Sequence, residues 1–366
     1  MHIKSIAVKN FRNLNLETEL SPGLNFVIAG NGAGKSNLLD SIFQLSHGHS
    51  FKPSNEGGNI NWKSRVNFAK LSAALMQERL YELQLIISEL EDRNLRSFSI
   101  NGRRKARRAF INMVGCVLFA PQDLDIISGS PEVRRSELND FLSQIDDEYS
   151  DSIKSYRLIL KNRNKLLQRI ADGFADIKEL AYWDERLVHF GSNIMFKRNE
   201  LLEQFRPVLK QQAEDLFNAE VRNLGLEYIS KFTAEKGLDA ITASFHSKLE
   251  DNAYKEISAK KTLYGPHRDD FELNLNKRPL KYYGSRGQQR LAALILKLAM
   301  LDFLEQLKGE SIILLLDDVM SELDKIHRAN LEKILQKMNS QIVITATDKS
   351  DFTPEFLASG KILNLL

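Results

Sequence analysis

Residues 28–37 have the sequence Ile28-Ala29-Gly30-Asn31-Gly32-Ala33-Gly34-Lys35-Ser36-Asn37. A mostly apolar run at 24–28 leads into this segment and predicts a short strand, and the residues after it predict a helix. Glycines and a Gly-Lys-Ser sequence in that context are typical of a phosphate-binding loop, because small residues let successive backbone N–H groups point at phosphate oxygens. Ala29 stands where the general pattern has its first glycine, and we expect the remaining glycines to keep the loop flexible.

The loop predicts a site for ATP and Mg²⁺. Lys35 is placed to neutralise the β and γ phosphates, which is a catalytic role, and the hydroxyl of Ser36 is placed to hold Mg²⁺. The helix that follows adds the positive end of its dipole. The predicted nucleotide-binding residues of the loop are Gly30, Asn31, Gly32, Ala33, Gly34, Lys35, Ser36 and Asn37. The alternative is a glycine-rich turn without a ligand.

A second motif is an apolar run that ends in two carboxylates. Residues 312–316 are all isoleucine or leucine, and Asp317 and Asp318 follow directly. Such a run suits a central strand of a parallel sheet, and ligands of these sheets bind at the carboxyl ends of the strands. We therefore predict that Asp317 binds Mg²⁺ and that Asp318 polarises the attacking water as a catalytic general base. Many such ATPases carry the longer glutamate at this second position, so we expect slow hydrolysis.

A third motif is Tyr283-Gly284-Ser285-Arg286-Gly287-Gln288-Gln289, which stands ahead of a predicted helix at 288–306. It resembles the signature of ABC-type ATPases, and Ser321-Glu322-Leu323-Asp324 resembles their D-loop. The resemblance implies that Ser285, in a catalytic role, and Gln288 face the γ-phosphate held by a second copy, so that ATP joins two copies into a homodimer. A helix start with unpaired N–H donors suits that role.

Length, charge and cysteine content narrow the class of protein. The chain has 366 residues, enough for two domains or for one domain with a large insertion, and its net charge of +3 is too small to indicate nucleic acid by itself. Cys116 is the single cysteine, which excludes intrachain disulfides and multi-cysteine metal sites and suggests a reducing compartment. No apolar window is long enough to span a bilayer and no signal peptide is evident, so we expect a cytoplasmic protein with no membrane contact.

Strand and helix patterns divide the chain into three zones. Residues 1–125 are rich in strand signals, including one at 96–100 before an Asn-Gly turn. Residues 126–258 show apolar side chains at helical spacing, and 259–366 return to mixed strands and helices. We predict an α/β fold in which the first and third zones form one ABC-type P-loop ATPase lobe, with the signature, the acidic strand end and the D-loop in its C-terminal part. The middle zone forms an inserted, mostly helical lobe.

Further blocks are similar to the RecF family, within the wider group of RecF and SMC ATPases. They are Lys9-Asn10-Phe11-Arg12-Asn13, Leu45-Ser46-His47-Gly48-His49-Ser50-Phe51, Gly129-Ser130-Pro131-Glu132-Val133-Arg134-Arg135, Leu263-Tyr264-Gly265-Pro266-His267-Arg268-Asp269-Asp270 and Ser285-Arg286-Gly287-Gln288. The resemblance implies that Arg12 contacts the nucleotide. Gln122 is either the Q-loop residue that contacts ATP or only a loop residue. Thr347 stands where many ABC-type ATPases carry a switch histidine.

The resemblance also implies a function, namely that of an ATP-dependent recombination mediator with weak ATPase activity. Such a protein dimerises on ATP, binds double-stranded DNA near single-strand gaps, and helps partners of the RecO and RecR type to load a recombinase in DNA repair, replication and the SOS response. The alternative is another SMC-like chromosome-maintenance ATPase, although the helical zone is short for that group. A transporter ATPase commonly carries the switch histidine, and an ATPase-coupled nuclease needs a further domain, so both fit less well.

Two basic clusters are candidates for DNA contact. One follows the Asn-Gly turn and consists of Arg103, Arg104, Lys105, Arg107 and Arg108. The other consists of Lys154, Arg157, Lys161, Arg163, Lys165 and Arg169, several of which share one helix face. Each cluster is either a DNA contact or a solvated surface. Neither contains a row of interleaved aromatic residues, so we expect contacts to the DNA backbone rather than base stacking.

Overall fold

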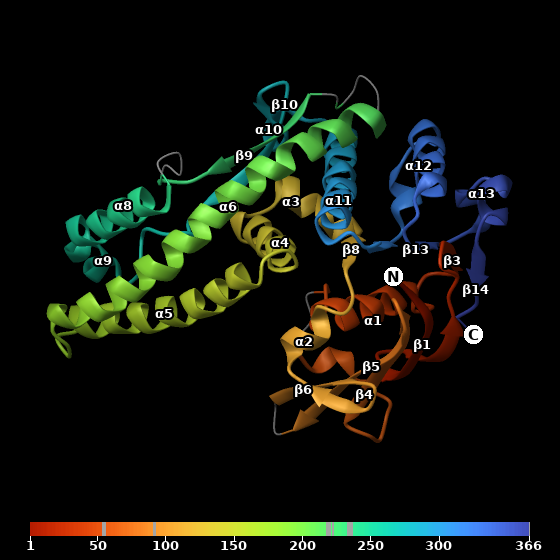
Figure 1. Ribbon diagram of the computed structural model, residues 1–366, viewed down its shortest axis with the longest axis horizontal. Coiled ribbons are helices and arrows are strands. Elements are labelled where there is room, and N and C mark those ends of the chain that lie inside the picture. The colour runs from red at the N-terminus through yellow and green to blue at the C-terminus, as the bar shows by residue number, and fades with distance from the viewer. Residues whose placement is uncertain (53–55, 91–92, 217–220, 222, 233–236, 366) are drawn as a thin grey trace. The chain divides into compact units, whose positions relative to one another are not determined.

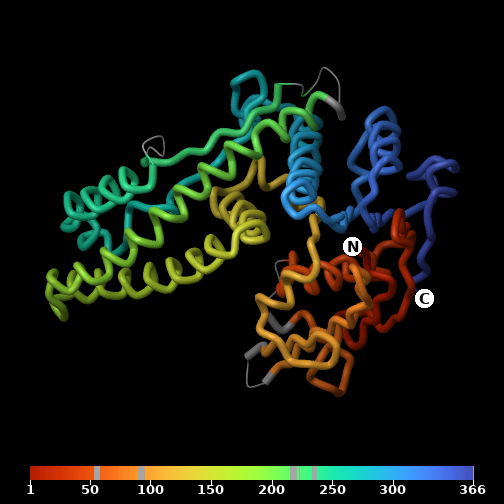
Figure 2. Tube along the Cα trace, in the orientation of Figure 1, coloured from red at the N-terminus to blue at the C-terminus, as the bar shows by residue number. Residues whose placement is uncertain are grey.

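Five parallel strands form the central sheet of the first part of the structure. They are β3 (Leu24–Ile28), β8 (Cys116–Phe119), β12 (Ile313–Leu316), β13 (Ile342–Ala346) and β14 (Lys361–Leu363), in the order β14-β3-β13-β12-β8. β8, β12 and β13 are buried along their whole length, as expected of apolar strands covered on both faces. The red β3 pairs with the blue β13 and β14, so strands from the two ends of the chain share one sheet (Figure 2).

The structure is a computed structural model that describes residues 1–366 apart from 53–55, 91–92, 217–220, 222, 233–236 and 366. Contacts divide the chain into a first unit of Met1–Asp123, Asp215–Asn218 and Leu294–Leu366, and a second unit of Leu124–Glu214 and Ala219–Ala293. Residues 259–293, which we assigned to the ATPase lobe, therefore pack with the helical unit. Our boundaries at 125/126 and 258/259 follow motifs rather than contacts, and they stay a prediction.

An antiparallel sheet of six strands completes the first unit. Its strands are β1 (His2–Phe11), β2 (Leu14–Glu19), β4 (Phe68–Met76), β5 (Leu80–Leu90), β6 (Arg93–Ile100) and β7 (Arg103–Lys105), in the order β2-β1-β4-β5-β6-β7. Alternate side chains of β4 are buried, so the sheet turns one face to the core. α1 (Lys35–His47) packs against strands of both sheets and buries eleven of its thirteen residues, which fixes the helix that carries Lys35 and Ser36 (Figure 1).

β6 and β7 are joined by the predicted tight hairpin. Asn101 and Gly102 have φ of 50° and 72°, the combination for which Asn-Gly is preferred. The remaining helices of this unit are α2 (Arg107–Ile111), α12 (Lys325–Lys337), α13 (Pro354–Ala358) and the C-terminal part of α11 (Arg286–Lys308). Arg107 of the basic cluster donates to His47 O at 2.7 Å, so it also holds α2 against α1.

The second unit is mostly helical but also contains a small sheet. Its helices are α3 (Asp125–Ser128), α4 (Pro131–Ser143), α5 (Asp147–Ala171), α6 (Leu180–Leu216), α8 (Gly237–Asp251), α9 (Ala253–Ala259) and α10 (Leu280–Tyr283). β9 (Leu224–Ile229), β10 (Asp270–Leu275) and β11 (Arg278–Pro279) form an antiparallel sheet in the order β11-β10-β9. The sequence predicted a mostly helical lobe and did not predict β9, whose partner β10 lies far along the chain. No helix in the described part of the chain has the length and apolar character to cross a bilayer.

Two of the RecF-like blocks meet inside this unit. Arg134 forms a two-point ion pair with Asp270, with distances of 2.8 Å from Nε to Oδ1 and 2.7 Å from Nη2 to Oδ2. His267 contacts Tyr156 Oη at 2.7 Å and Thr262 O at 3.2 Å, and burial lowers the pKa of His267 to about 4. The ring is therefore neutral near pH 7 and acts as a hydrogen-bonding group that joins α5 to the loop before β10.

Arg163 does not belong to the surface cluster that we predicted on this helix. Its side chain is fully buried and forms ion pairs with Asp184 and with Glu256, whose Oε2 lies 2.7 Å from Arg163 Nη2. The position follows Ile159 by four residues and precedes Leu166 by three, so it lies on the buried stripe of α5. The other members of the cluster are exposed on α5, namely Lys154, Arg157, Lys161, Lys165 and Arg169.

Arg163→Leu is expected to lower the free energy of unfolding by about 3 to 5 kcal/mol, because it leaves the buried carboxylate of Glu256 without its counter-charge. Lys161→Leu is a matched control at an exposed position of the same helix, and we expect it to stay within about 0.5 kcal/mol of the wild type. Urea unfolding followed by circular dichroism measures both variants. Equal stability of the two would show that the buried ion pair contributes nothing.

Candidate functional site

The predicted phosphate loop lies between β3 and α1 and requires glycine at two positions. Gly32 and Gly34 have φ of 80° and 104°, in the left-handed region that other residues rarely adopt. A Cβ added at Gly34 would lie 2.5 Å from Leu14 Cδ2. Gly34 caps α1 without a side-chain hydrogen bond, so the first N–H groups of this helix stay open to an anion.

The ammonium group of Lys35 is held over this loop. Lys35 is 5% exposed, and its Nζ donates to Ala29 O at 2.7 Å and to Gly30 O at 3.3 Å. One pocket is lined by Gly30, Asn31, Gly32, Gly34, Lys35, Ser36, Asn37, Lys52 and Asp318. Of the loop residues that we predicted to bind nucleotide, Ala33 alone does not line this pocket. A buried cation beside open N–H groups makes a positive site that suits phosphate.

The two residues predicted to hold Mg²⁺ lie in contact. Ser36 Oγ donates to Asp317 Oδ1 at 3.0 Å, and Asp317 is 6% exposed at the end of β12. Thr345 on the neighbouring strand β13 donates to the same oxygen at 2.8 Å and accepts from Asp318 N at 2.9 Å. Sequence reasoning missed Thr345, although its place at the carboxyl end of a parallel strand is the signal that points to it.

Asp318 presents its carboxylate to the same pocket. Its Oδ1 is buried and has no hydrogen-bond partner, and the residue adopts φ of 48°. Burial raises the pKa of the Asp318 carboxyl, the charge of Lys35 opposes that rise and the charge of Asp317 adds to it. An unsatisfied buried oxygen with a raised carboxyl pKa is typical of a group that takes part in proton transfer. The arrangement therefore fits a nucleotide, a metal ion and a water molecule at one end of the sheet.

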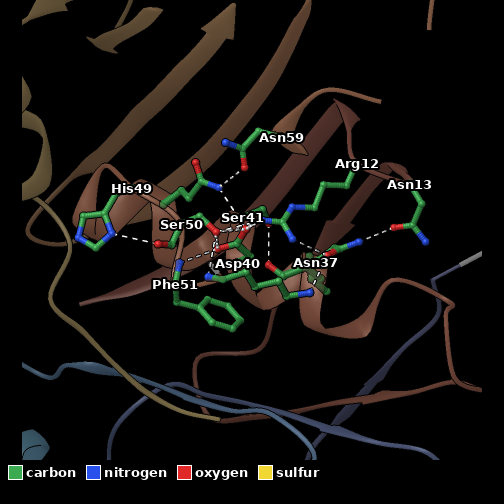
Figure 3. Close-up of polar contacts among 12 residues, drawn as sticks. Arg12, Asn13, Asn37, Asp40, Ser41, His49, Ser50, Phe51 and Asn59 are labelled. Carbon is green, nitrogen blue, oxygen red and sulfur yellow. Dashed lines mark hydrogen bonds and ion pairs between the residues drawn. The ribbon is translucent and has the colours of Figure 1, made fainter. Parts of the chain in front are cut away.

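Arg12, which we predicted to contact the nucleotide, contacts side chains of α1 (Figure 3). It does not line the pocket. Its Nη2 lies 2.7 Å from Asp40 Oδ2 and donates to Ser50 Oγ at 2.9 Å, and its Nη1 donates to Asn37 Oδ1 at 3.3 Å. Burial raises the pKa of the fully buried Asp40, and the Arg12 guanidinium opposes that rise. Arg12 thus reaches the phosphate loop through Asn37, and a direct nucleotide contact stays a prediction.

Two more residues at the loop were missed. Lys52 lines the pocket and its Nζ donates to Asn37 Oδ1 at 2.8 Å, while burial and the nearby charge of Arg12 lower the pKa of Lys52. Asn13 donates to Gly32 O at 3.0 Å and accepts from Asn37 Nδ2 at 2.7 Å. Asn13 lies in one RecF-like block and Lys52 directly follows another, but neither has a fixed spacing from Gly-Lys-Ser that would have singled it out.

The signature residues form the start of α11. Gln288 N donates to Ser285 Oγ at 3.2 Å and Ser285 N donates to Gln288 Oε1 at 2.9 Å, which is a reciprocal capping arrangement. Ser285 itself is exposed. The hydroxyl group of Ser285 therefore lies at the positive N-terminal end of a long helix, where a second molecule can contact it.

The two remaining sequence candidates lie at strand ends. Gln122 is exposed in the short turn after β8, and a contact to ATP stays a prediction. Thr347 is exposed one residue after β13, where its Oγ1 donates to Asp351 Oδ2 at 3.4 Å. Thr347, which we placed where many ABC-type ATPases carry the switch histidine, thus bonds within its own loop.

Comparison with known proteins finds relatives that match this chain over nearly its whole length. The family model of the RecF/RecN/SMC N-terminal domain matches residues 2–355. The DNA replication and repair protein RecF of Heliobacterium modesticaldum is 35% identical over 371 residues, covering 100% of this chain and 97% of the relative. The chain belongs to the RecF family.

Other RecF proteins and solved structures agree. RecF of Ligilactobacillus salivarius is 34% identical, with 100% of this chain and 96% of the relative covered. A structure of the recombination mediator protein RecF with ATP matches with a TM-score of 0.85 at 31% identity, over 96% of this chain and 93% of the other. An SMC head domain matches with a TM-score of 0.57 at 14% identity, over 100% of this chain and 94% of the other, and thus shares the fold. The predicted ABC-type ATPase fold is confirmed.

Gly34→Ala is expected to lower the free energy of unfolding by about 1 to 3 kcal/mol, since it combines an unfavourable φ with a clash against Leu14. Gly30→Ala is the matched control in the same loop, because an added Cβ there meets no atom within 4 Å. Thermal unfolding without nucleotide measures both effects independently of any ligand. A Gly34→Ala protein as stable as Gly30→Ala would contradict this account of the loop.

Proposed function

We propose that the chain is an ATP-dependent, DNA-binding recombination mediator that dimerises on ATP and supports recombinase loading at single-strand gaps in DNA repair and replication. The observation that carries the proposal is the hydrogen bond between Ser36 and Asp317. Ser36 lines the same pocket as Lys35 and as Asp318, whose Oδ1 has no hydrogen-bond partner. RecF relatives of nearly the same length, named DNA replication and repair proteins, support the cellular role. Another SMC-like role has less support, because the matched SMC head is 14% identical.

ATP is the substrate in this proposal, and its phosphates lie against the loop. The open N–H groups of α1 and the Lys35 ammonium bind the β and γ phosphates, while Ser36 and Asp317 hold Mg²⁺. When bound, Mg²⁺ neutralises phosphate oxygens. No group of three His, Cys, Asp or Glu side chains among the described residues could hold a metal ion. Mg²⁺ is commonly held by one or two carboxylates together with substrate phosphates.

Asp318 accepts a proton from the attacking water in this scheme. Its unpartnered Oδ1 is available for a hydrogen bond, and its raised carboxyl pKa brings its basicity closer to that needed near neutral pH. The short aspartate side chain reaches less far than a glutamate. We therefore propose weak ATPase activity that times the separation of the dimer and the release of DNA.

A second copy completes the pocket. Ser285 is exposed at the N-terminus of α11, where the capping arrangement with Gln288 orients its hydroxyl group. The positive helix end attracts the γ-phosphate held by another copy, so the nucleotide itself joins the two copies. Hydrolysis removes this bridging charge.

Exposed cations supply the DNA contacts. Arg103, Arg104 and Lys105 lie on β7, and five further cations lie on the exposed side of α5. Contacts to phosphates favour duplex DNA with little sequence preference and strong salt dependence. The matched RecF structures are described in a RecFOR pathway, which supports partners of the RecO and RecR type. A protein that acts on bacterial chromosomal DNA works in the cytoplasm, which is the location we propose.

Ser285→Arg is expected to bind ATP normally but to remain a monomer. The long arginine side chain occupies the space in which the Ser285 hydroxyl group faces the nucleotide of the other copy. Sedimentation velocity with ATP and Mg²⁺ measures the dimer, and equilibrium nucleotide binding serves as the check on the pocket. Ser244→Arg, at an exposed position of α8, is the control that should dimerise like the wild type. Dimers of Ser285→Arg would disprove the role of Ser285 between copies.

Asp318→Asn is expected to reduce ATP hydrolysis by about a hundredfold or more and to leave ATP-joined dimers that do not separate, since an amide cannot accept the proton from water. Steady-state phosphate release and the dimer lifetime after dilution measure the two effects. Glu322→Gln, which changes a partly buried acid in the following turn to its amide, serves as the charge-matched comparison. Normal turnover in Asp318→Asn would remove this residue from the catalytic role.

A further inference from the structure

Trp62 is the most exposed large apolar side chain in the described part of the chain, at 84%. It lies in the segment between Ile60 and the start of β4, where Val66 and Phe68 are also exposed. Exposing so large a ring to water costs free energy, and exposed aromatic side chains commonly mark sites that bind a partner. The segment is therefore a candidate for an interaction that the nucleotide pocket does not explain.

The charges around Trp62 are all positive along this part of the chain. Lys63 Nζ lies 5.1 Å from the centre of the Trp62 ring, and Arg65 is exposed two residues further on. Residues 57–77 contain no aspartate or glutamate. Where β1 and β4 pair, Lys9 lies opposite Lys70 and adds two more cations. An aromatic ring among cations is the combination that binds single-stranded nucleic acid, with the ring for bases and the cations for phosphates.

Hydrogen bonds hold this segment in one shape. Asn61 Oδ1 accepts from Lys63 N at 2.9 Å, and Asn61 N donates to Asn10 O at 3.0 Å. The side-chain amide of Asn10 donates to the carbonyls of Val66 and Phe68. The Trp62 ring is thus displayed by an ordered turn, so that little conformational entropy is lost when a base stacks on it.

The same turn is linked to the phosphate loop. Asn10 lies near the end of β1, and the β1–β2 connection follows it directly. In this connection Arg12 N donates to Asn59 O at 3.0 Å and Asn13 donates to Gly32 O at 3.0 Å. Hydrogen bonds therefore run from the loop that binds phosphate to both ends of the Trp62 segment. The segment and the nucleotide pocket are therefore joined through the hydrogen bonds of the β1–β2 connection.

We propose that Trp62 stacks on an unpaired base of single-stranded DNA, while Lys63 and Arg65 contact the flanking phosphates. The inference rests on the proposed function and deepens it, because it provides a contact for the single-stranded part of a gap that the two basic clusters do not provide. Bases inside a duplex are already stacked on one another, so the ring discriminates between unpaired and paired DNA. Our expectation that DNA contacts involve the backbone alone applies to those two clusters and not to this segment.

Tryptophan fluorescence gives a direct readout of stacking. The chain has two tryptophans, so Trp183→Phe leaves Trp62 as the single emitter. Titration with oligothymidylate, with a gapped duplex and with a blunt duplex, in ATP and Mg²⁺, is expected to quench the emission with the first two and to leave it nearly unchanged with the third. Equal emission changes with all three ligands, or none with the first two, would overturn the proposal.

Substitution measures the contribution to affinity. Trp62→Ala is expected to bind gapped DNA about five- to a hundredfold more weakly, the range for loss of one stacked base, while blunt-duplex binding is unchanged. Trp62→Phe should keep part of the affinity, and Tyr254→Ala is the control at an aromatic residue that is 81% exposed elsewhere. Unaltered gap binding by Trp62→Ala would refute this inference and leave the proposed function intact. Absence of all DNA binding by the wild type would instead refute the proposed function.

Discussion

The carboxylate of Asp317 accepts hydrogen bonds from Ser36 on α1 and from Thr345 on β13, and so joins three elements at one end of the parallel sheet. Because Asp317 is almost completely buried, its charge is stable only with donors of this kind or with a cation beside it. The same contacts fix the distance between the helix that carries Lys35 and the end of β12, which Asp318 follows. The geometry of the pocket therefore depends on this carboxylate more than on any single contact of the loop.

Much of the first unit could be predicted because its signals are local. The strand at 24–28, the apolar strand before Asp317, the Asn-Gly hairpin and the helix after the signature each have a pattern within a few residues of chain. Contacts between residues that lie far apart in the sequence leave no such local pattern. Thr345 contacts Asp317 only because β13 lies beside β12. Lys52 reaches the pocket only because the chain returns to Asn37 after α1.

In the helical unit, reasoning from the sequence made errors. We grouped Arg163 with the exposed cations of α5, although its spacing from the apolar residues of the same helix indicated a buried position. β9 was missed because its hydrogen-bond partner is β10, which follows α8 and α9 along the chain. The resemblance to the RecF family identified the blocks that meet here, such as Arg134 with Asp270, but not the contacts between them.

The account requires that one complete pocket takes its phosphate loop from one copy and its Ser285 from another. Mixing Lys35→Ala with Ser285→Arg tests this requirement most directly, since each variant lacks a different half of every pocket. We predict that each is inactive alone and that the mixture hydrolyses ATP, because a dimer of one copy of each holds one intact pair of Lys35 and Ser285. If the mixture of the two folded variants stays as inactive as its components, the pocket is not shared between copies.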